Sequence, residues 1–166
     1  MSLLFDFTVD KEKKTIHVTR EFAADRDVVW DAFTKAEILE QWIAPKPFKA
    51  YIKEMDFREG GRCITAMISP ENVARFSLAE YIKIDPKSSF FSRNSFCDEN
   101  ANPLNNGFSL TTTSFEPGTD TTTVHIEKIF NDLATVEIMV SGGYKEGLVM
   151  GMNNLDEYLH SLVTAK

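Results

Sequence analysis

The sequence contains only two cysteines, Cys63 and Cys97, and no run of more than three consecutive apolar residues. The two cysteines are not in a CxxC spacing and make a poor disulfide framework, which favours a reducing compartment. Without a longer apolar run, we expect neither a signal peptide nor a membrane-spanning helix. Acidic residues outnumber basic ones, 25 to 18, so the net charge is −7 and the chain has no electrostatic footprint for nucleic acid or anionic lipid. These absences predict a soluble, cytoplasmic protein that binds neither nucleic acid nor membranes.

The sequence also lacks the short motifs of common catalytic and cofactor sites. It has no GxGxxG, P-loop, GxSxG or HExxH motif. Its histidines, His17, His125 and His160, lie in three separate segments without the spacing of metal ligands. The sequence therefore predicts no set of catalytic residues, no metal site and no cofactor.

The composition fits one globular domain. A chain of 166 residues is long enough to bury a core without disulfides or metals, and we expect a single domain over residues 1–166 with its core at about 14–163. Thirteen phenylalanines outnumber the two tryptophans and four tyrosines together. Phenylalanine adds ring area without a polar atom, so these residues predict an apolar core, built mostly from strands.

Alternation and turn residues predict the order of the elements. A period of two at residues 14–22 predicts a strand with Ile16, Val18 and Phe22 buried. Two short amphipathic helices follow, one starting after a possible cap at Asp25 and one ending before Pro45. Six strands are then expected at 48–57, 62–69, 74–84, 88–96, 108–116 and 121–130, with a hairpin turn at residues 60–61 and a polar loop at 98–106. No helix interrupts them, which favours an antiparallel meander, and the threonine runs at 111–113 and 121–123 suit its wetter face.

The last part of the chain is helical in pattern. Asp132 is a candidate cap for a helix over 133–140, residues 142–143 interrupt the pattern, and a long helix is expected at about 144–162. Its apolar stripe comprises Leu148, Met152, Leu155, Leu159 and Leu162. Gly147 and Gly151 each cost roughly 1 kcal/mol relative to alanine, which indicates close packing or, as the less favoured alternative, room for a ligand.

Three segments resemble motifs of one known family. TREFAADRDVVWDAFTKAEILEQWIAP, residues 19–45, resembles the N-terminal signature of the START-like (SRPBCC) superfamily. MDFREGGR and GGYKEGLVMGMNNLDEYL resemble the hairpin and the C-terminal helix of homologues of the activator of heat-shock protein 90 ATPase. The resemblance implies an α+β, helix-grip fold, in which a curved antiparallel sheet wraps a long C-terminal helix and two short helices follow the first strand. In such a fold, Trp30 and Trp42 would plug one end of the space between sheet and helix.

The sequence departs from that family at two places. Leu148 stands where the family helix usually has tryptophan, and the run Cys63–Met67 stands where the third strand often has aromatic residues. Smaller side chains at both places predict a larger space between the sheet and the helix.

These features predict a binding module that holds a small apolar or aromatic ligand between the sheet and the C-terminal helix. The sequence leaves a homodimer open. The candidate ligand-binding residues are Trp30, Phe33, Phe57, Cys63, Thr65, Met67, Tyr81, Phe91, His125, Leu148 and Met152.

Two other function classes stay open. An enzyme similar to the cyclases and aromatases of the wider superfamily would have Arg20, Tyr81 and His125 for pocket chemistry. We expect Arg20 to pair with a carboxylate of a helix rather than with a ligand, His125 to face solvent, and Cys63 to be an unreactive core thiol. The resemblance also implies a chaperone-ATPase-activating interaction domain, although the namesake activator uses a further N-terminal domain for its partner.

Overall fold

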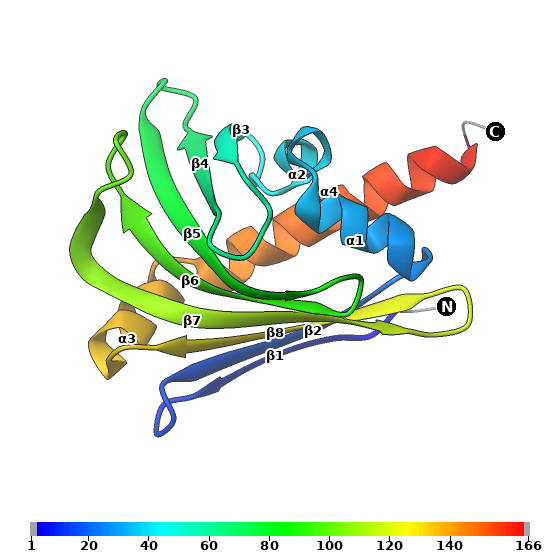
Figure 1. The fold of residues 1–166 in the computed structure, drawn as a ribbon, viewed down its shortest axis with the longest axis horizontal. Coiled ribbons are helices and arrows are strands. Elements are labelled where there is room, and N and C mark those ends of the chain that lie inside the picture. Colours follow the sequence, from blue (N-terminus) through cyan, green and yellow to red (C-terminus); the bar gives the residue numbers. More distant parts are fainter. Residues whose placement is uncertain (1–2, 165–166) are drawn as a thin grey trace.

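One antiparallel sheet of eight strands curves around a long C-terminal helix (Figure 1). The computed structural model describes residues 3–164. The strands are β1 (Phe5–Asp10), β2 (Thr15–Phe22), β3 (Lys49–Met55), β4 (Arg62–Ile68), β5 (Ala74–Asp85), β6 (Ser89–Cys97), β7 (Pro103–Pro117) and β8 (Thr122–Phe130). The helices are α1 (Arg26–Thr34), α2 (Ala36–Trp42), α3 (Leu133–Ser141) and α4 (Tyr144–Thr164). This architecture confirms the α+β helix-grip fold.

The sheet consists of a six-stranded meander to which one non-sequential pairing adds β2 and β1. Strands β3 to β8 pair in chain order, and β8 then pairs with β2, so the sheet order is β1-β2-β8-β7-β6-β5-β4-β3. Val18 lies opposite Ile126 across the β2–β8 pair, and both side chains are buried on the face that α4 covers. The predicted alternation of β2 is confirmed, because Ile16 and Phe22 are buried on this face as well.

Two features of the strands differ from the expectation. Strand β1 was not predicted, so the two short helices follow the second strand rather than the first. Its Phe5, Phe7 and Val9 pack against the main core, and this alternation is a period-two signal at the start of the chain. Strand β7 begins at Pro103, inside the segment expected to be a polar loop.

The hairpin of β3 and β4 turns where the glycines predicted it. Gly60 has a φ of +85°, a conformation that glycine adopts without strain. The turn is also fixed to β5, because the Gly60 amide donates to the Tyr81 carbonyl and the Tyr81 amide donates to the Gly61 carbonyl, each at 2.9 Å.

Both tryptophans close the end of the structure where α1 and α2 lie. The Trp30 ring packs edge-on against Phe115 and Phe57, with centroids 5.1 and 5.7 Å apart. The Trp42 indole nitrogen donates to the Ala32 carbonyl at 2.9 Å, so α2 is tied to α1. Buried rings of this size anchor helices too short to be stable alone.

The two predicted helix caps have different outcomes. Asp132 caps α3 as expected, since its carboxylate accepts a hydrogen bond from the Thr135 amide at 2.8 Å. Asp25 occupies the cap position of α1, but its side chain makes no capping hydrogen bond. Only its backbone carbonyl accepts, from the amides of Val28 and Val29.

Helix α4 packs closely against the end of α2. A Cβ atom on Gly151 would lie 3.2 Å from the Ile43 carbonyl oxygen and 3.3 Å from that of Trp42. The Asn154 side chain donates to the carbonyls of Trp42 and Ala44, at 3.2 and 3.0 Å. Gly151 thus has the packing reason that the sequence favoured, although its partner is the end of α2 rather than the sheet.

The two helix glycines predict opposite responses to alanine. In Gly147→Ala the new Cβ would meet only the Pro45 ring, at an ordinary 3.8 Å, so we expect the free energy of unfolding to rise by about 0.5–1 kcal/mol. In Gly151→Ala the contact with two carbonyls should remove most or all of this gain. Urea denaturation of both variants measures the difference, and equal stabilisation would contradict the close approach of α4 to α2.

Candidate functional site

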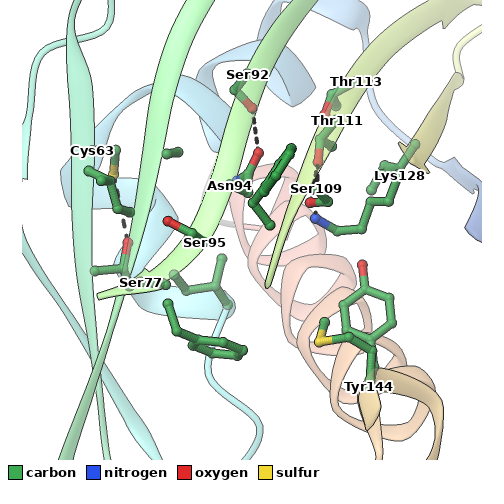
Figure 2. Close-up of a pocket in the computed structure, with 18 of the residues that line it drawn as sticks. Cys63, Ser77, Ser92, Asn94, Ser95, Ser109, Thr111, Thr113, Lys128 and Tyr144 are labelled. Atoms are coloured by element: carbon green, nitrogen blue, oxygen red, sulfur yellow. Dashed lines mark hydrogen bonds between the residues drawn. The ribbon is translucent and has the colours of Figure 1, made fainter. Parts of the chain in front are cut away.

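A cavity of about 450 Å³ lies between the concave face of the sheet and side chains of all four helices (Figure 2). Its volume falls within the roughly 300–1,000 Å³ of pockets that hold small organic molecules. The space predicted from Leu148, Cys63 and Thr65 is therefore present, and these three residues line it.

The cavity exists because the inward positions of β4 to β7 carry small side chains. These side chains are Cys63, Thr65, Ser77, Ala79, Ser92, Asn94, Ser109, Thr111 and Thr113. The opposite wall is largely apolar and includes Phe33, Leu39, Trp42, Met139 and Leu148. Small side chains cannot reach across to the helices, so the two walls enclose space instead of packing together.

The threonine run of β7 was assigned to the wrong face. Thr111 and Thr113 are buried on the concave face, and only Thr112 lies in a groove on the outer face. Strand alternation places two of the three threonines on the inner face, where their hydroxyls form part of the polar wall.

Hydrogen bonds connect the polar side chains of the sheet wall (Figure 2). The Ser92 hydroxyl donates to Asn94 Oδ1 at 2.7 Å, and the hydroxyls of Ser109 and Thr111 share a hydrogen bond of 3.2 Å. The Lys128 ammonium donates to Thr111 Oγ1 at 3.2 Å. One side of the cavity can thus offer hydroxyl, amide and ammonium groups to a ligand, while the other side offers apolar surface.

Lys128 was missed by the sequence reasoning. It lies on β8 in phase with Val124, Ile126 and Phe130, which are all buried, so the period-two pattern that placed Arg20 inward also places Lys128 inward. Its nitrogen lies 6.0 Å from the centre of the Tyr144 ring. Burial lowers the pKa of Lys128 to about 8, because the charged form loses water without gaining a carboxylate partner among the described residues.

Cys63 and Tyr81 line the cavity as neutral groups. Burial raises the pKa of the Cys63 thiol, whose sulfur lies 3.7 Å from Thr65 Oγ1. Burial also raises the pKa of the Tyr81 phenol, which packs edge-on against Phe57. Both groups therefore stay protonated near neutral pH, and the thiol lacks the thiolate character of a reactive cysteine.

The structure brings together five of the candidate ligand-binding residues. Those along the cavity are Phe33, Cys63, Thr65, Tyr81 and Leu148. Trp30 and Phe57 lie behind the cavity-lining Phe90, each in edge-on ring contact with it. Met152 is fully buried in the main core.

The remaining candidates do not line the cavity. Phe91 alternates with Phe90 and Ser92, which both point inward, so its ring lies on the outer face of β6. Met67 lies near the end of β4, opposite Ala50 of β3. His125 lies in the groove of the outer face, where its Nε2 is 3.1 Å from Glu116 Oε1. The alternation of the strands thus separates Phe91 and His125 from the cavity, whereas Met67 shares the phase of Cys63 and Thr65 but does not line it.

Arg20 points inward but is satisfied by the protein itself. Its guanidinium pairs with the carboxylate of Asp156 on α4 and lies 3.4 Å from Asn153 Oδ1. Burial raises the pKa of Asp156, and the charge of Arg20 opposes that rise. The expected pairing with a helix carboxylate is confirmed. Of the three residues named for enzyme chemistry, only Tyr81 reaches the cavity.

The described part of the chain contains neither a metal-binding cluster nor a membrane-spanning helix. Within residues 3–164, no three histidine, cysteine, aspartate or glutamate side chains are grouped so that they could hold a metal ion. No helix of this part of the chain is long and apolar enough to cross a membrane.

The fold of the chain is similar to the folds of several solved bacterial proteins. Protein Ms6760 from Mycobacterium smegmatis has a TM-score of 0.87 at 24% identity, with 95% of this chain and 97% of that chain covered. A protein from Staphylococcus epidermidis has a TM-score of 0.80 at 25% identity, with 93% and 94% covered. The AHSA1 protein from Silicibacter pomeroyi has a TM-score of 0.71 at 17% identity, with 88% and 97% covered.

The sequence comparisons give the family directly. No curated protein matches the chain. The profile of the family described as "Activator of Hsp90 ATPase homolog 1-like protein" matches residues 23–160, from the end of β2 into the last turns of α4. The chain therefore belongs to the activator of Hsp90 ATPase homolog 1-like family.

Proposed function

We propose that the protein binds a small hydrophobic or aromatic molecule in the cavity between the sheet and α4. The observation that carries the proposal is an unfilled volume of about 450 Å³ with an apolar wall on the helices and hydroxyl groups on the sheet. Binding pockets of small molecules combine these features, since apolar surface supplies affinity and a few polar groups fix orientation. The name of the family refers to a chaperone ATPase, but the cavity is the feature of this chain that supports a specific function, and it favours ligand binding.

Filling the cavity should abolish binding. Thr65 lines the cavity from β4, so Thr65→Trp places an indole in the empty volume, and we expect the variant to lose binding of the neutral dye Nile red. Because the ring enters existing space, the melting temperature should change little, whereas overpacking a filled core costs about 1–3 kcal/mol. Dye fluorescence titrations and thermal melts measure the two effects.

A matched control makes the same substitution on the other face. Thr112 lies on the outer face of β7, so Thr112→Trp should leave Nile red binding unchanged. The proposal fails if the parent protein binds no dye, or if Thr65→Trp lowers the melting temperature markedly while dye binding persists. Native mass spectrometry of the purified parent protein gives a second test, since a co-purified apolar molecule would support the proposal.

A further inference from the structure

Lys128 is the one described residue of the cavity wall whose side chain is charged at neutral pH. The other titratable groups of the wall are Cys63, Tyr81 and Tyr144, and burial raises the pKa of each, so all three are neutral. An ammonium group in apolar surroundings normally has a carboxylate partner, because its desolvation is otherwise uncompensated. The hydrogen bond from Lys128 to Thr111 supplies only a neutral partner.

Comparison with Arg20 shows that Lys128 lacks a carboxylate partner among the described residues. Both residues point inward from neighbouring strands, β2 and β8. Arg20 pairs with the carboxylate of Asp156 on α4. Lys128 instead faces the ring of Tyr144 on the same helix, and this side chain carries no charge. Arg20 thus has a carboxylate partner within the protein, whereas Lys128 has none among the described residues and is available to an anionic ligand.

The groups around Lys128 suit a carboxylate. The hydroxyls of Ser109 and Thr111 lie beside the ammonium, and the Tyr144 hydroxyl points toward the same part of the sheet (Figure 2). A carboxylate accepts several hydrogen bonds, so one oxygen can take the ammonium and the other a hydroxyl. Only one cation is present, which fits a ligand with a single negative charge.

The apolar wall sets the shape of the rest of the ligand. Tyr144, Leu148 and Gly151 line the cavity from successive turns of α4, and the Trp42 carbonyl lies next to Gly151. At 1.5 Å per residue, the distance along the helix from Tyr144 to Gly151 is about 10 Å. The Lys128 ammonium lies at the Tyr144 end of this line, and Trp42 lies at the Gly151 end.

We propose that the ligand is an amphipathic monocarboxylic acid, whose carboxylate pairs with Lys128 and whose aromatic or aliphatic body lies along Leu148 toward Trp42. This inference rests on the proposed function, because it specifies the ligand class of the same cavity. It assigns Lys128 as the residue that distinguishes acids from neutral molecules of the same shape.

The test compares 2-naphthoic acid with 2-naphthamide, which share a ring system and differ in charge. Binding to the parent protein and to Lys128→Met is measured by calorimetry at neutral pH. We expect Lys128→Met to weaken binding of the acid by about tenfold or more, as befits a charge-assisted hydrogen bond, and to change binding of the amide by less than about threefold. Lys128→Gln, which keeps a donor without the charge, should weaken acid binding similarly.

A matched lysine and a pH series complete the test. Lys83 is exposed on β5 outside the cavity wall, so Lys83→Met should leave binding of the acid unchanged. For the parent protein, affinity for the acid should fall as pH rises above about 8 and Lys128 loses its proton, while affinity for the amide stays constant. Cys63, Tyr81 and Tyr144, which face the cavity from β4, β5 and α4, stay neutral over this range because burial raises the pKa of each.

The outcomes separate this inference from the proposed function. If acid and amide bind equally well and Lys128→Met affects both alike, the cavity binds ligands but the acid assignment is wrong. If neither compound binds and Nile red does not bind either, the proposed function fails together with the inference.

Discussion

Leu155→Asp is expected to leave the protein unfolded under conditions in which the parent protein is stable. Leu155 is fully buried on α4 and belongs to the main core. Truncating such a leucine costs about 2–5 kcal/mol, and a carboxylate in its place adds the cost of burying a charge without a partner. Domains are stable by only about 5–15 kcal/mol, so the variant should lose its near-ultraviolet circular dichroism and its cooperative melting.

The same helix offers the control for this experiment. Leu162 was predicted to continue the buried stripe of α4, but its side chain is 38% exposed. Leu162→Asp should therefore cost less than about 1 kcal/mol, since surface substitutions are mild. A folded Leu155→Asp variant with the parental melting temperature would mean that the assigned buried face of α4 is wrong.

Lys128→Met is expected to make the protein more stable. The lowering of the Lys128 pKa from 10.5 to about 8 corresponds to at most roughly 3 kcal/mol of unfavourable desolvation, because the side chain is only partly buried. Methionine fills similar space without a charge, so the melting temperature should rise, by up to about 10 °C. An unchanged or lower melting temperature would show that the ammonium group is not desolvated in the folded protein.

The pH dependence of stability gives an independent readout of the same burial. Because the folded-state pKa of Lys128 lies below the unfolded value, the unfolded chain binds more protons between about pH 8 and 10.5, and the Lys128 contribution to stability rises with pH there. Burial raises the pKa values of Cys63, Tyr81 and Tyr144, so their contribution to stability falls as pH rises above the ordinary pKa values of these groups. The difference in free energy of unfolding between parent and Lys128→Met isolates the lysine, and it should shrink as pH rises through this window.

Most of the fold could be predicted because the sequence carries local signals for it. The alternation of β2, the glycines at the β3–β4 turn and the stripe of α4 each reflect one element and its immediate neighbours. Strand β1 carries the same alternation in Phe5, Phe7 and Val9, so its omission reflects an overlooked signal rather than a missing one. The exposure of Leu162 is different, because Leu162 lies in the last turn of α4, and whether the core reaches that turn is not encoded in the helical pattern.

The cavity was only partly predictable from the sequence. The substitution of smaller residues at Cys63, Thr65 and Leu148 indicated extra space, and these residues do line it. The small side chains of β5, β6 and β7 contribute as much, but serine and threonine in strands are equally common on solvent faces. Which face they occupy depends on the register of eight strands, and with it the position of Lys128 among them.

The hydrogen bonds between α4 and the end of α2 have a consequence for how fast a ligand could leave. Asn154 holds the carbonyls of Trp42 and Ala44, so this end of the cavity cannot widen unless those bonds break. At the other end, Ile138 and Met139 of α3 form part of the wall, and Ile138 is 64% exposed. For a ligand bound as proposed above, we therefore expect exchange to pass beside α3, so that mutations in α3 should change the residence time more than mutations at the α2–α4 contact.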